Sequence, residues 1–258
     1  MQRTIVFILG LSIALATLGI EVAHASDEPS STSAKSAEAM EIMKKAEQAA
    51  KKIKLARYTA EYKATGWVTK HVPHVEGTAV IGEPSEYDLL RFFAEIKLTP
   101  YDTKETTQVS AGCDGDLSYL IDHQAKMVYA DIDPAVLGAH ERDIQRLLVR
   151  EFVAEEPFAD ELKAKKMELQ DEVQVGDEKC HQVRVELQPG RAAIWSFSKK
   201  DLLPRRIERV YANREDPEAE PGTTTLTLTN LVAETKFRIE PFKLAVPPGF
   251  TKTDEFAP

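Results

Sequence analysis

Cysteine, tryptophan and recognisable catalytic motifs are scarce in this chain of 258 residues, which has two cysteines and two tryptophans. No HExxH segment and no paired CxxC segments occur, although these are the usual marks of a zinc site. A Gly-x-Ser-x-Gly nucleophile motif, a glycine-rich phosphate loop and a dinucleotide fingerprint are also absent. We therefore expect a protein that is not an enzyme and that has no cofactor and no metal. A hydrolase remains the alternative, because a Ser/His/Asp triad assembled in space leaves no local motif.

Positive charge is also in deficit. The chain has 33 basic and 42 acidic side chains, which gives a formal net charge of −9. A net acidic chain binds nucleic acid poorly and is repelled in bulk from anionic membrane surfaces. Hydrophobic residues make up 43% of the sequence, which is enough to build a core. We expect a folded protein with no nucleic-acid partner.

An apolar run at residues 5–20 follows Arg3 and precedes a small-x-small segment at residues 23–25. This pattern is typical of a secretory signal peptide, and the run is short for a stable membrane span. We predict that residues 1–25 are a signal peptide cleaved after Ala25, and that the mature protein is periplasmic without stable membrane insertion. The alternative is a retained signal anchor. No cysteine follows the cleavage site to serve as the lipid attachment point of a bacterial lipoprotein.

The remaining chain alternates between helical and extended patterns. Residues 26–36 are small and polar and predict a flexible leader. Apolar residues at a spacing of three to four predict a helix over residues 37–57, and a second helical region over residues 134–156. Strict alternation elsewhere predicts nine to eleven antiparallel strands, the last at residues 237–242. Because no repeat and no linker divides it, we expect residues 37–258 to form a single α+β domain.

The segment at residues 192–211 predicts two strands joined by a polar turn. Ala193, Trp195 and Phe197 share one face of the first strand, at the period of two that a pleated sheet requires. Pro204 suits the start of the returning strand, where the loss of a backbone donor matters least. The large indole must be buried against more sheet or a helix, or it must hold a ligand.

The order of these elements resembles the LolA/LolB-like superfamily of periplasmic lipoprotein carriers, over residues 38–256. The most specific part begins at Trp195 (WSFSKKDLLPRRI), and the hairpin beginning at Asp114 (DGDLSY) and the PPGF segment at residues 247–250 support it. The resemblance implies a strongly curved antiparallel sheet that forms an open half-barrel. It also implies that an N-terminal helix and a central helical insertion cover the concave apolar face. In the carriers this cavity takes acyl chains.

We therefore expect an exported carrier or sensor that holds the acyl chains of a lipid or lipoprotein in the half-barrel. The alternative is a packed interaction or structural protein that acts through its outer surface, and an envelope protein partner fits either role. Alternation places a set of residues inward, without separating cavity lining from packed core: Leu90, Phe92, Ile96, Tyr119, Ile121, Val183, Val185, Trp195, Phe197, Leu226 and Leu228.

The two cysteines, Cys113 and Cys180, each lie at the edge of a predicted strand. Disulfides persist in exported proteins, so we predict a bridge between them, with two buried free thiols as the alternative. His71 and His74 lie on a predicted turn, where solvated histidines are favoured over zinc ligands because this spacing is nonspecific.

Positive charge concentrates around the hairpin that carries Trp195. Such a group can face anionic head groups or an acidic partner, although solvated strand faces are the simpler interpretation. The members of this predicted basic surface are Lys199, Lys200, Arg205, Arg206 and Arg209.

Overall fold

The computed structural model describes residues 31–213, 216 and 218–255. The predicted signal peptide, its cleavage site and residues 26–30 of the predicted leader lie outside the described residues. Among the helices in the described part of the chain, none has the length and apolar character needed to cross a membrane.

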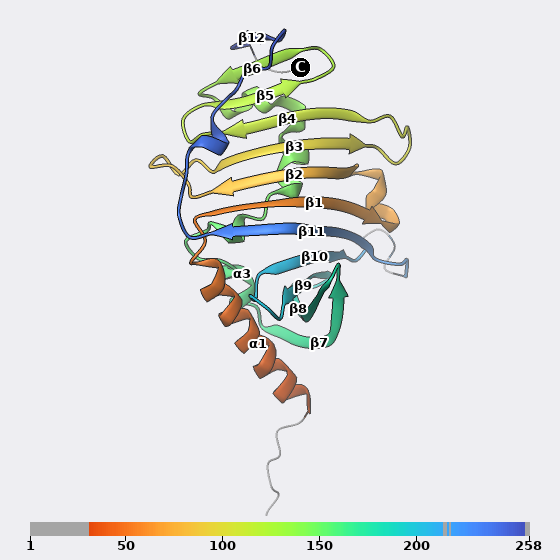
Figure 1. Cartoon of the computed structure of the whole chain (residues 1–258). Helices are drawn as coiled ribbons and strands as arrows, with labels where there is room; N and C mark the ends of the chain where they lie inside the picture. Colours follow the sequence, from red (N-terminus) through yellow and green to blue (C-terminus); the bar gives the residue numbers. More distant parts are fainter. Residues whose placement is uncertain (1–30, 214–215, 217, 256–258) are drawn as a thin grey trace, which may run out of the picture.

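Twelve strands form one open sheet in the order β12-β6-β5-β4-β3-β2-β1-β11-β10-β9-β8-β7 (Figure 1). Neighbouring strands are antiparallel except β12 and β6, which are parallel. The strands β7 to β9 turn away from the plane of β1 to β5, so the sheet is the curved, unclosed half-barrel of an α+β fold that the sequence predicted. The strands are β1 (Leu55–Thr65), β2 (His74–Gly82), β3 (Arg91–Thr99), β4 (Thr107–Cys113), β5 (Ser118–Asp122), β6 (Met127–Asp131), β7 (Lys166–Val175), β8 (Glu178–Gln188), β9 (Arg191–Ser198), β10 (Pro204–Tyr211), β11 (Gly222–Glu234) and β12 (Thr251–Thr253).

Strand β11 joins the two halves of the sheet. It pairs with β1 on one side and with β10 on the other. Leu226 of β11 lies opposite Tyr62 of β1 and opposite Ile207 of β10, so these three side chains form one row across the inner face.

The inner face is covered by the segment between β6 and β7, which we call the insertion. Its 3-10 helix η2 (Pro134–His140) contacts β5 and β6, and its helix α2 (Glu141–Leu147) contacts β1, β2 and β3. The short helices η3 (Arg150–Phe152) and α3 (Ala159–Leu162) follow. The helical insertion predicted at residues 134–156 is confirmed, but it is broken, because Gly138 has a positive φ of 55° and Leu148 is extended.

The first helix is shifted from its predicted range. Helix α1 runs over Ser31–Ala50, begins inside the predicted leader and packs against β7, β8 and α3. Leu55 and Ala56, which fall within the predicted helix, are the first residues of β1, because both pair with β2 and β11.

Buried apolar side chains gather on both faces of the sheet. The larger cluster lies on the inner face beneath the insertion, and a smaller one around Tyr119 and Val128 lies on the outer face, where Leu244 and Phe250 cover it. Residues 237–242 were predicted as the last strand, and this prediction is wrong. They lead into the 3-10 helix η4 (Glu240–Phe242), in which Phe242 is fully buried and its carbonyl oxygen accepts a hydrogen bond from Tyr119 Oη at 2.9 Å.

Candidate functional site

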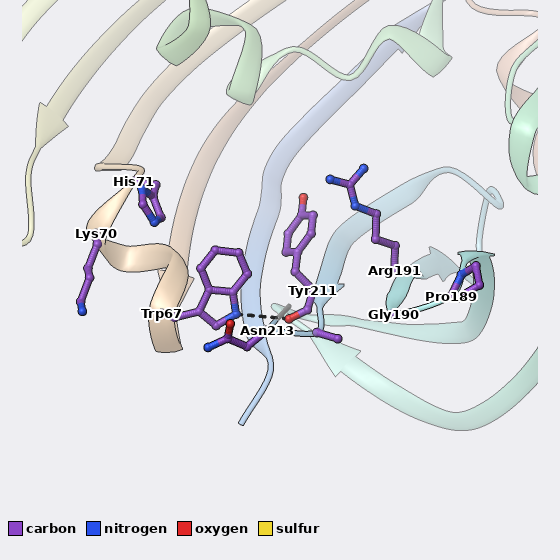
Figure 2. Close-up of a pocket in the computed structure, with 9 residues that line it drawn as sticks. Trp67, Lys70, His71, Pro189, Gly190, Arg191, Tyr211 and Asn213 are labelled. Carbon is purple, nitrogen blue, oxygen red and sulfur yellow. Dashed lines mark hydrogen bonds between the residues drawn. The ribbon is translucent and has the colours of Figure 1, made fainter. Parts of the chain in front are cut away.

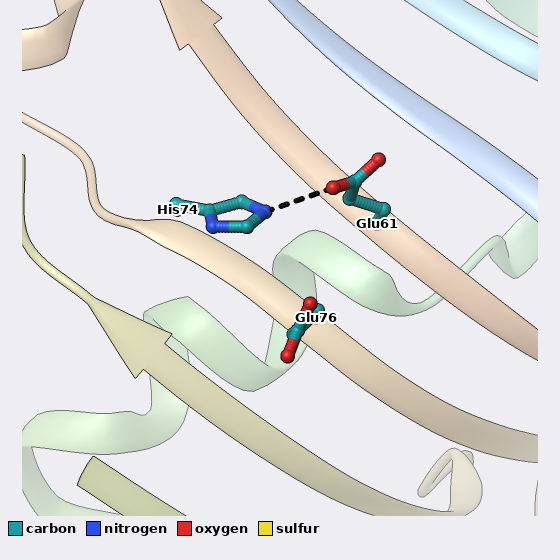
Figure 3. A group of neighbouring side chains, drawn as sticks. All are labelled: Glu61, His74 and Glu76. Atoms are coloured by element: carbon teal, nitrogen blue, oxygen red, sulfur yellow. Dashed lines mark hydrogen bonds and ion pairs between the residues drawn. The ribbon is translucent and has the colours of Figure 1, made fainter. Parts of the chain in front are cut away.

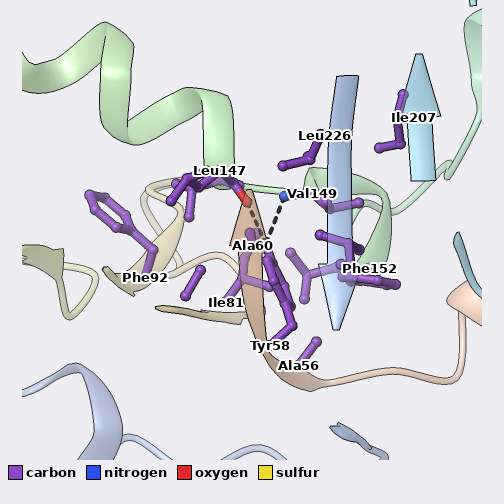
Figure 4. Close-up of a cluster of buried hydrophobic side chains, with 14 of the residues drawn as sticks. Ala56, Tyr58, Ala60, Ile81, Phe92, Leu147, Val149, Phe152, Ile207 and Leu226 are labelled. Carbon is purple, nitrogen blue, oxygen red and sulfur yellow. Dashed lines mark hydrogen bonds between the residues drawn. The ribbon is translucent and has the colours of Figure 1, made fainter. Parts of the chain in front are cut away.

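Tyr58 ties the insertion to the sheet (Figure 4). Its hydroxyl donates to the carbonyl oxygen of Leu147 at 2.9 Å and accepts from the backbone N–H of Val149 at 2.9 Å. These two backbone groups flank the end of α2, where a helix leaves its last carbonyls without partners. The ring of Tyr58 also contacts Phe152, with 5.7 Å between centroids. Burial raises the pKa of Tyr58, so the hydroxyl stays neutral and keeps both hydrogen bonds.

A hollow of about 430 Å³ lies between the insertion and the sheet, and we call it the ligand hollow. Its floor is the row of Tyr62, Leu226 and Ile207 on three neighbouring strands. Residues 145–146 and 148–151 of the insertion lie across from this row, and Arg209, Tyr211 and Thr224 complete the lining. The hollow therefore combines an apolar floor with polar and charged walls. Its volume falls within the usual range of small-molecule sites, about 300–1,000 Å³.

The charges in the ligand hollow are mostly positive. Arg146, Arg150 and Arg209 line it together with one carboxylate, Glu151. The guanidinium of Arg146 lies 5.8 Å from the centroid of the Tyr62 ring. Burial raises the pKa of Glu151, and the charge of Glu161 adds to this effect while Arg209 opposes it. The pKa of Glu151 is therefore higher than that of an ordinary carboxyl. Arg146 forms an ion pair with Asp143, so Arg150 and Arg209 are the cations that face Glu151 in the hollow.

Trp195 lies at the centre of a packed aromatic group. Its ring contacts Phe158 at 5.0 Å and Phe197 at 5.9 Å between centroids, and its Nε1 donates to Glu161 Oε1 at 3.2 Å. Both Trp195 and Phe197 are fully buried, and burial raises the pKa of Glu161. Of the alternatives that the sequence left open for the indole, the structure places it against strands and α3, within the core.

A second depression of about 550 Å³ adjoins the ends of β1 and β10 (Figure 2), and we call it the rim pocket. Arg191 stacks over Tyr211, its guanidinium 5.8 Å from the ring centroid, and the two residues are directly opposite in the β9–β10 pair. Trp67 Nε1 donates to the backbone oxygen of Tyr211 at 3.4 Å, and its ring meets His71 edge-on at 5.9 Å. Lys70 completes the positively charged part of the lining.

Tyr211 lines both depressions, so the ligand hollow and the rim pocket adjoin one another. Within the described part of the chain, the residues that line the two include one carboxylate, Glu151, and five permanently basic side chains: Lys70, Arg146, Arg150, Arg191 and Arg209. Asp143 pairs with Arg146, so four of these basic side chains remain against Glu151, and in a chain with a net charge of −9 this is a local reversal of sign. Such a reversal beside an apolar floor suits an anionic molecule with an apolar tail.

The residues predicted to line a cavity fall into three groups. Leu226 lines the ligand hollow. Tyr119 and Ile121 lie on the outer face, because Leu120 is the residue of β5 that belongs to the inner cluster, so their predicted inward orientation is wrong. The others lie in or against the inner core: Leu90, Phe92, Ile96, Val183, Val185, Trp195, Phe197 and Leu228. Their contact with a ligand stays a prediction.

The predicted disulfide is wrong, since Cys113 and Cys180 are both free and buried. Cys113 ends β4 and Cys180 lies in β8, and six strands separate these two in the sheet. Adjacent strands are about 4.8 Å apart. The separation is therefore far beyond the Cα distance of about 4.4–6.8 Å that a disulfide requires.

The predicted basic surface is largely neutralised and is not one surface. Arg205 is buried and pairs with Glu178 at 2.9 Å and with Asp201 at 2.7 Å. Lys199 pairs with Glu172, and Arg206 pairs with Glu208 at 2.9 Å. Arg209 lies in the ligand hollow instead, while Lys200 is exposed in the turn before β10. Glu172 and Glu178 come from other strands and Asp201 from the turn, whereas Glu208 lies two residues from Arg206 on β10.

The two turn histidines lie in different environments. His71 belongs to the rim pocket, whereas His74 opens β2 and lies with its Nε2 3.1 Å from Glu61 Oε1 on the outer face. Among the residues that sequence reasoning missed are Tyr58, Glu151 and Trp67. Trp67 carried a usable signal, because it is one of two tryptophans in the chain. The other two gave none, since their partners are distant in sequence.

No family model and no curated protein sequence matches the chain. Among solved structures, LprF from Mycobacterium bovis is similar over 84% of this chain and 99% of its own, with 10% identity and a TM-score of 0.50. LppX, a lipoprotein from Mycobacterium tuberculosis, is similar over 76% of this chain and 95% of its own, with 11% identity and a TM-score of 0.45. A Vibrio parahaemolyticus domain described as that of an outer membrane lipoprotein-sorting protein is similar over 80% of this chain and 97% of its own, with 10% identity and a TM-score of 0.30. These likenesses concern the fold alone, and this chain shares the fold of LprF over almost all of that protein's length.

Proposed function

We propose that this chain is a periplasmic binding protein that holds an anionic amphiphile, with acyl chains in the ligand hollow and the charged head group in the rim pocket. The observation that carries the proposal is the adjacency of the two depressions at Tyr211. One offers an apolar floor on the inner face of an open sheet, and the other offers basic and aromatic side chains at its edge. The role is that of a carrier or sensor of a lipid or lipoprotein rather than that of an enzyme.

Different residues bind the acyl chain and the head group. Tyr62, Leu226 and Ile207 provide apolar contact for a chain that lies along the floor, at roughly 25 cal/mol per Å² of apolar surface buried. Lys70 and Arg191 provide charge-assisted hydrogen bonds to a phosphate or carboxylate. A longer acyl chain needs more room than the hollow has, and the insertion supplies it by moving away from the sheet once the hydrogen bonds of Tyr58 break.

The experiment that tests the proposal is native mass spectrometry with lipid extraction, on protein purified from the periplasm. Co-purified anionic lipid supports the proposal. Phosphatidylglycerol and diacylglycerol with the same acyl chains are then compared by displacement of a fluorescent fatty acid. We expect the anionic lipid to bind about tenfold more tightly, since a hydrogen bond to a charged group is worth roughly 1.5–3 kcal/mol.

A matched pair of variants separates the head-group site from the general charge of the protein. Arg191→Gln removes one positive charge in the rim pocket, and Lys44→Gln removes one from the exposed side of α1. We expect Arg191→Gln to remove most of the preference for phosphatidylglycerol and Lys44→Gln to leave it unchanged. Equal affinity of all three proteins for both lipids contradicts the proposal.

The packed interaction protein remains the second candidate, and one observation favours it. Trp195, Phe197 and Val183 are fully buried by protein, so the deepest part of the half-barrel holds side chains. This candidate predicts a ligand-free species in native mass spectrometry and no displacement of the fatty-acid probe by either lipid.

A further inference from the structure

The outer face of the sheet carries a group of three side chains that the ligand sites do not use. Glu61 lies on β1, and His74 and Glu76 lie two residues apart on β2, so all three point to the same face (Figure 3). One donor atom from each, the imidazole nitrogen or a carboxylate oxygen, lies within 4.8 Å of the others. His74 Nε2 is 3.1 Å from Glu61 Oε1.

The register makes this group unusual, because Glu61 and Glu76 are directly opposite each other in the β1–β2 pair. Like charges at directly opposed positions destabilise a sheet. Two lysines offset part of the repulsion, since Lys63 lies 2.7 Å from Glu61 and Lys97 lies 3.8 Å from Glu76. Exposed ion pairs of this kind contribute about 0–1 kcal/mol to stability, so they break at little cost when a cation binds. A divalent cation neutralises both carboxylates at once.

The donor set selects the kind of cation. One imidazole nitrogen and two carboxylate oxygens are three protein ligands of the types that zinc takes at open sites, at about 2.0–2.2 Å. In tetrahedral geometry, such bond lengths place neighbouring donor atoms about 3.3 Å apart. The contact between His74 and Glu61 already has this spacing, and the remaining separation is within reach of a rotation of the exposed Glu76 side chain.

The surroundings leave space for a fourth ligand. Glu61 and Glu76 line a groove of about 440 Å³ on this face, together with Thr59, Thr78 and Gln108. A water molecule or a ligand oxygen fits there beside the cation. His71, three residues before His74, takes no part because it lies against Trp67 in the rim pocket.

We propose that Glu61, His74 and Glu76 form a binding site for a divalent transition-metal ion of the zinc class on the outer face of the sheet. The site is independent of the proposed lipid binding, which uses the opposite face. Each ligand is supplied by a strand, so the pairing of β1 with β2 fixes the spacing between the Glu61 backbone and the backbones of the two β2 ligands.

The test is isothermal titration of the full mature chain with zinc chloride, after removal of any histidine tag, because a tag binds the metal itself. We expect one saturable site. His74→Ala, Glu61→Gln and Glu76→Gln are each expected to weaken zinc binding by at least about tenfold, since even the loss of a residue that only hydrogen-bonds to a metal ligand costs about 10–100-fold. The side chains are 26–50% exposed, so these substitutions leave the core intact.

Two control variants complete the design. His71→Ala removes the neighbouring histidine, and Glu95→Gln removes another carboxylate that lines the same groove. Both are expected to bind zinc as the wild type does. The proposal is overturned if the wild type shows no saturable binding, if the three ligand variants bind as tightly as the wild type, or if His71→Ala weakens binding as much as His74→Ala. Urea unfolding of every variant confirms that each is folded.

Discussion

Replacement of Tyr58 by Phe tests the attachment of the insertion to the sheet. The change removes one oxygen atom, which is both a donor to Leu147 and an acceptor from Val149, and it keeps the ring that contacts Phe152. A buried polar group that loses its partner costs about 1–3 kcal/mol. Because two backbone groups lose their partner and part of the loss is relieved by water, we expect the variant to be less stable by about 2–4 kcal/mol.

The location of the loss is as informative as its size. If the insertion opens as a unit, the lost stability appears first as faster hydrogen exchange of residues 141–153, while β2 and β3 keep their protection. Urea unfolding measures the global change, and hydrogen exchange with mass spectrometry measures the local one. Tyr62→Phe is the matched control, since Tyr62 lies in the same strand with its ring against Arg146.

The same variant carries a functional expectation. If Tyr58 holds the ligand hollow closed, its loss lowers the cost of opening, so lipid uptake becomes faster than in the wild type. A loss below about 0.5 kcal/mol, together with unchanged exchange in the insertion, would refute the assigned role of Tyr58.

Three further predictions concern the core. Burial raises the pKa of Glu161, so the contribution of this side chain to stability is fully present below the unfolded-state pKa and is lost as the pH rises through the folded-state pKa. In Glu161→Gln the amide oxygen still accepts the hydrogen bond from Trp195. Urea unfolding is therefore expected to show this variant more stable than the wild type at pH 8 and equally stable near pH 4. Cys113 and Cys180 are free, so a thiol assay on unfolded protein without reductant is expected to find two thiols per chain, and a count of zero would contradict the structure. A Cβ at Gly77 would lie 1.9 Å from a backbone oxygen of β3, so Gly77→Ala is expected to cost about 1–3 kcal/mol, and an unchanged urea midpoint would show that β2 and β3 can separate.

Local pattern was sufficient to predict most of the sheet. Alternation placed Phe92, Ile96 and Leu228 on the inner face, where they are buried, because a strand with one covered face repeats with a period of two. The same rule failed for Tyr119, because β5 has apolar residues on both faces and the C-terminal segment covers its second face. A pattern shows which residues share a face, but it does not show how many faces are covered.

The candidate site was harder to predict, because its residues meet only through tertiary structure. Glu151 of the insertion, Arg209 of β10 and Tyr62 of β1 line one hollow although they are far apart in sequence. The disulfide prediction failed for a related reason. The cellular compartment and the number of cysteines do not show how far apart two cysteines lie in the fold, and the strand order separates Cys113 from Cys180.

The position of β11 has a consequence for the order in which the sheet is completed during folding. Strands β1 to β6 form one meander of sequential neighbours and β7 to β10 form another, so each can assemble from segments that are close in sequence. The seam between them forms only when β11, near the end of the chain, reaches β1, and such distant pairing slows folding. Until then the edge of β1 is exposed as a template for another chain, so truncation before residue 222 is expected to yield aggregates rather than a smaller folded protein.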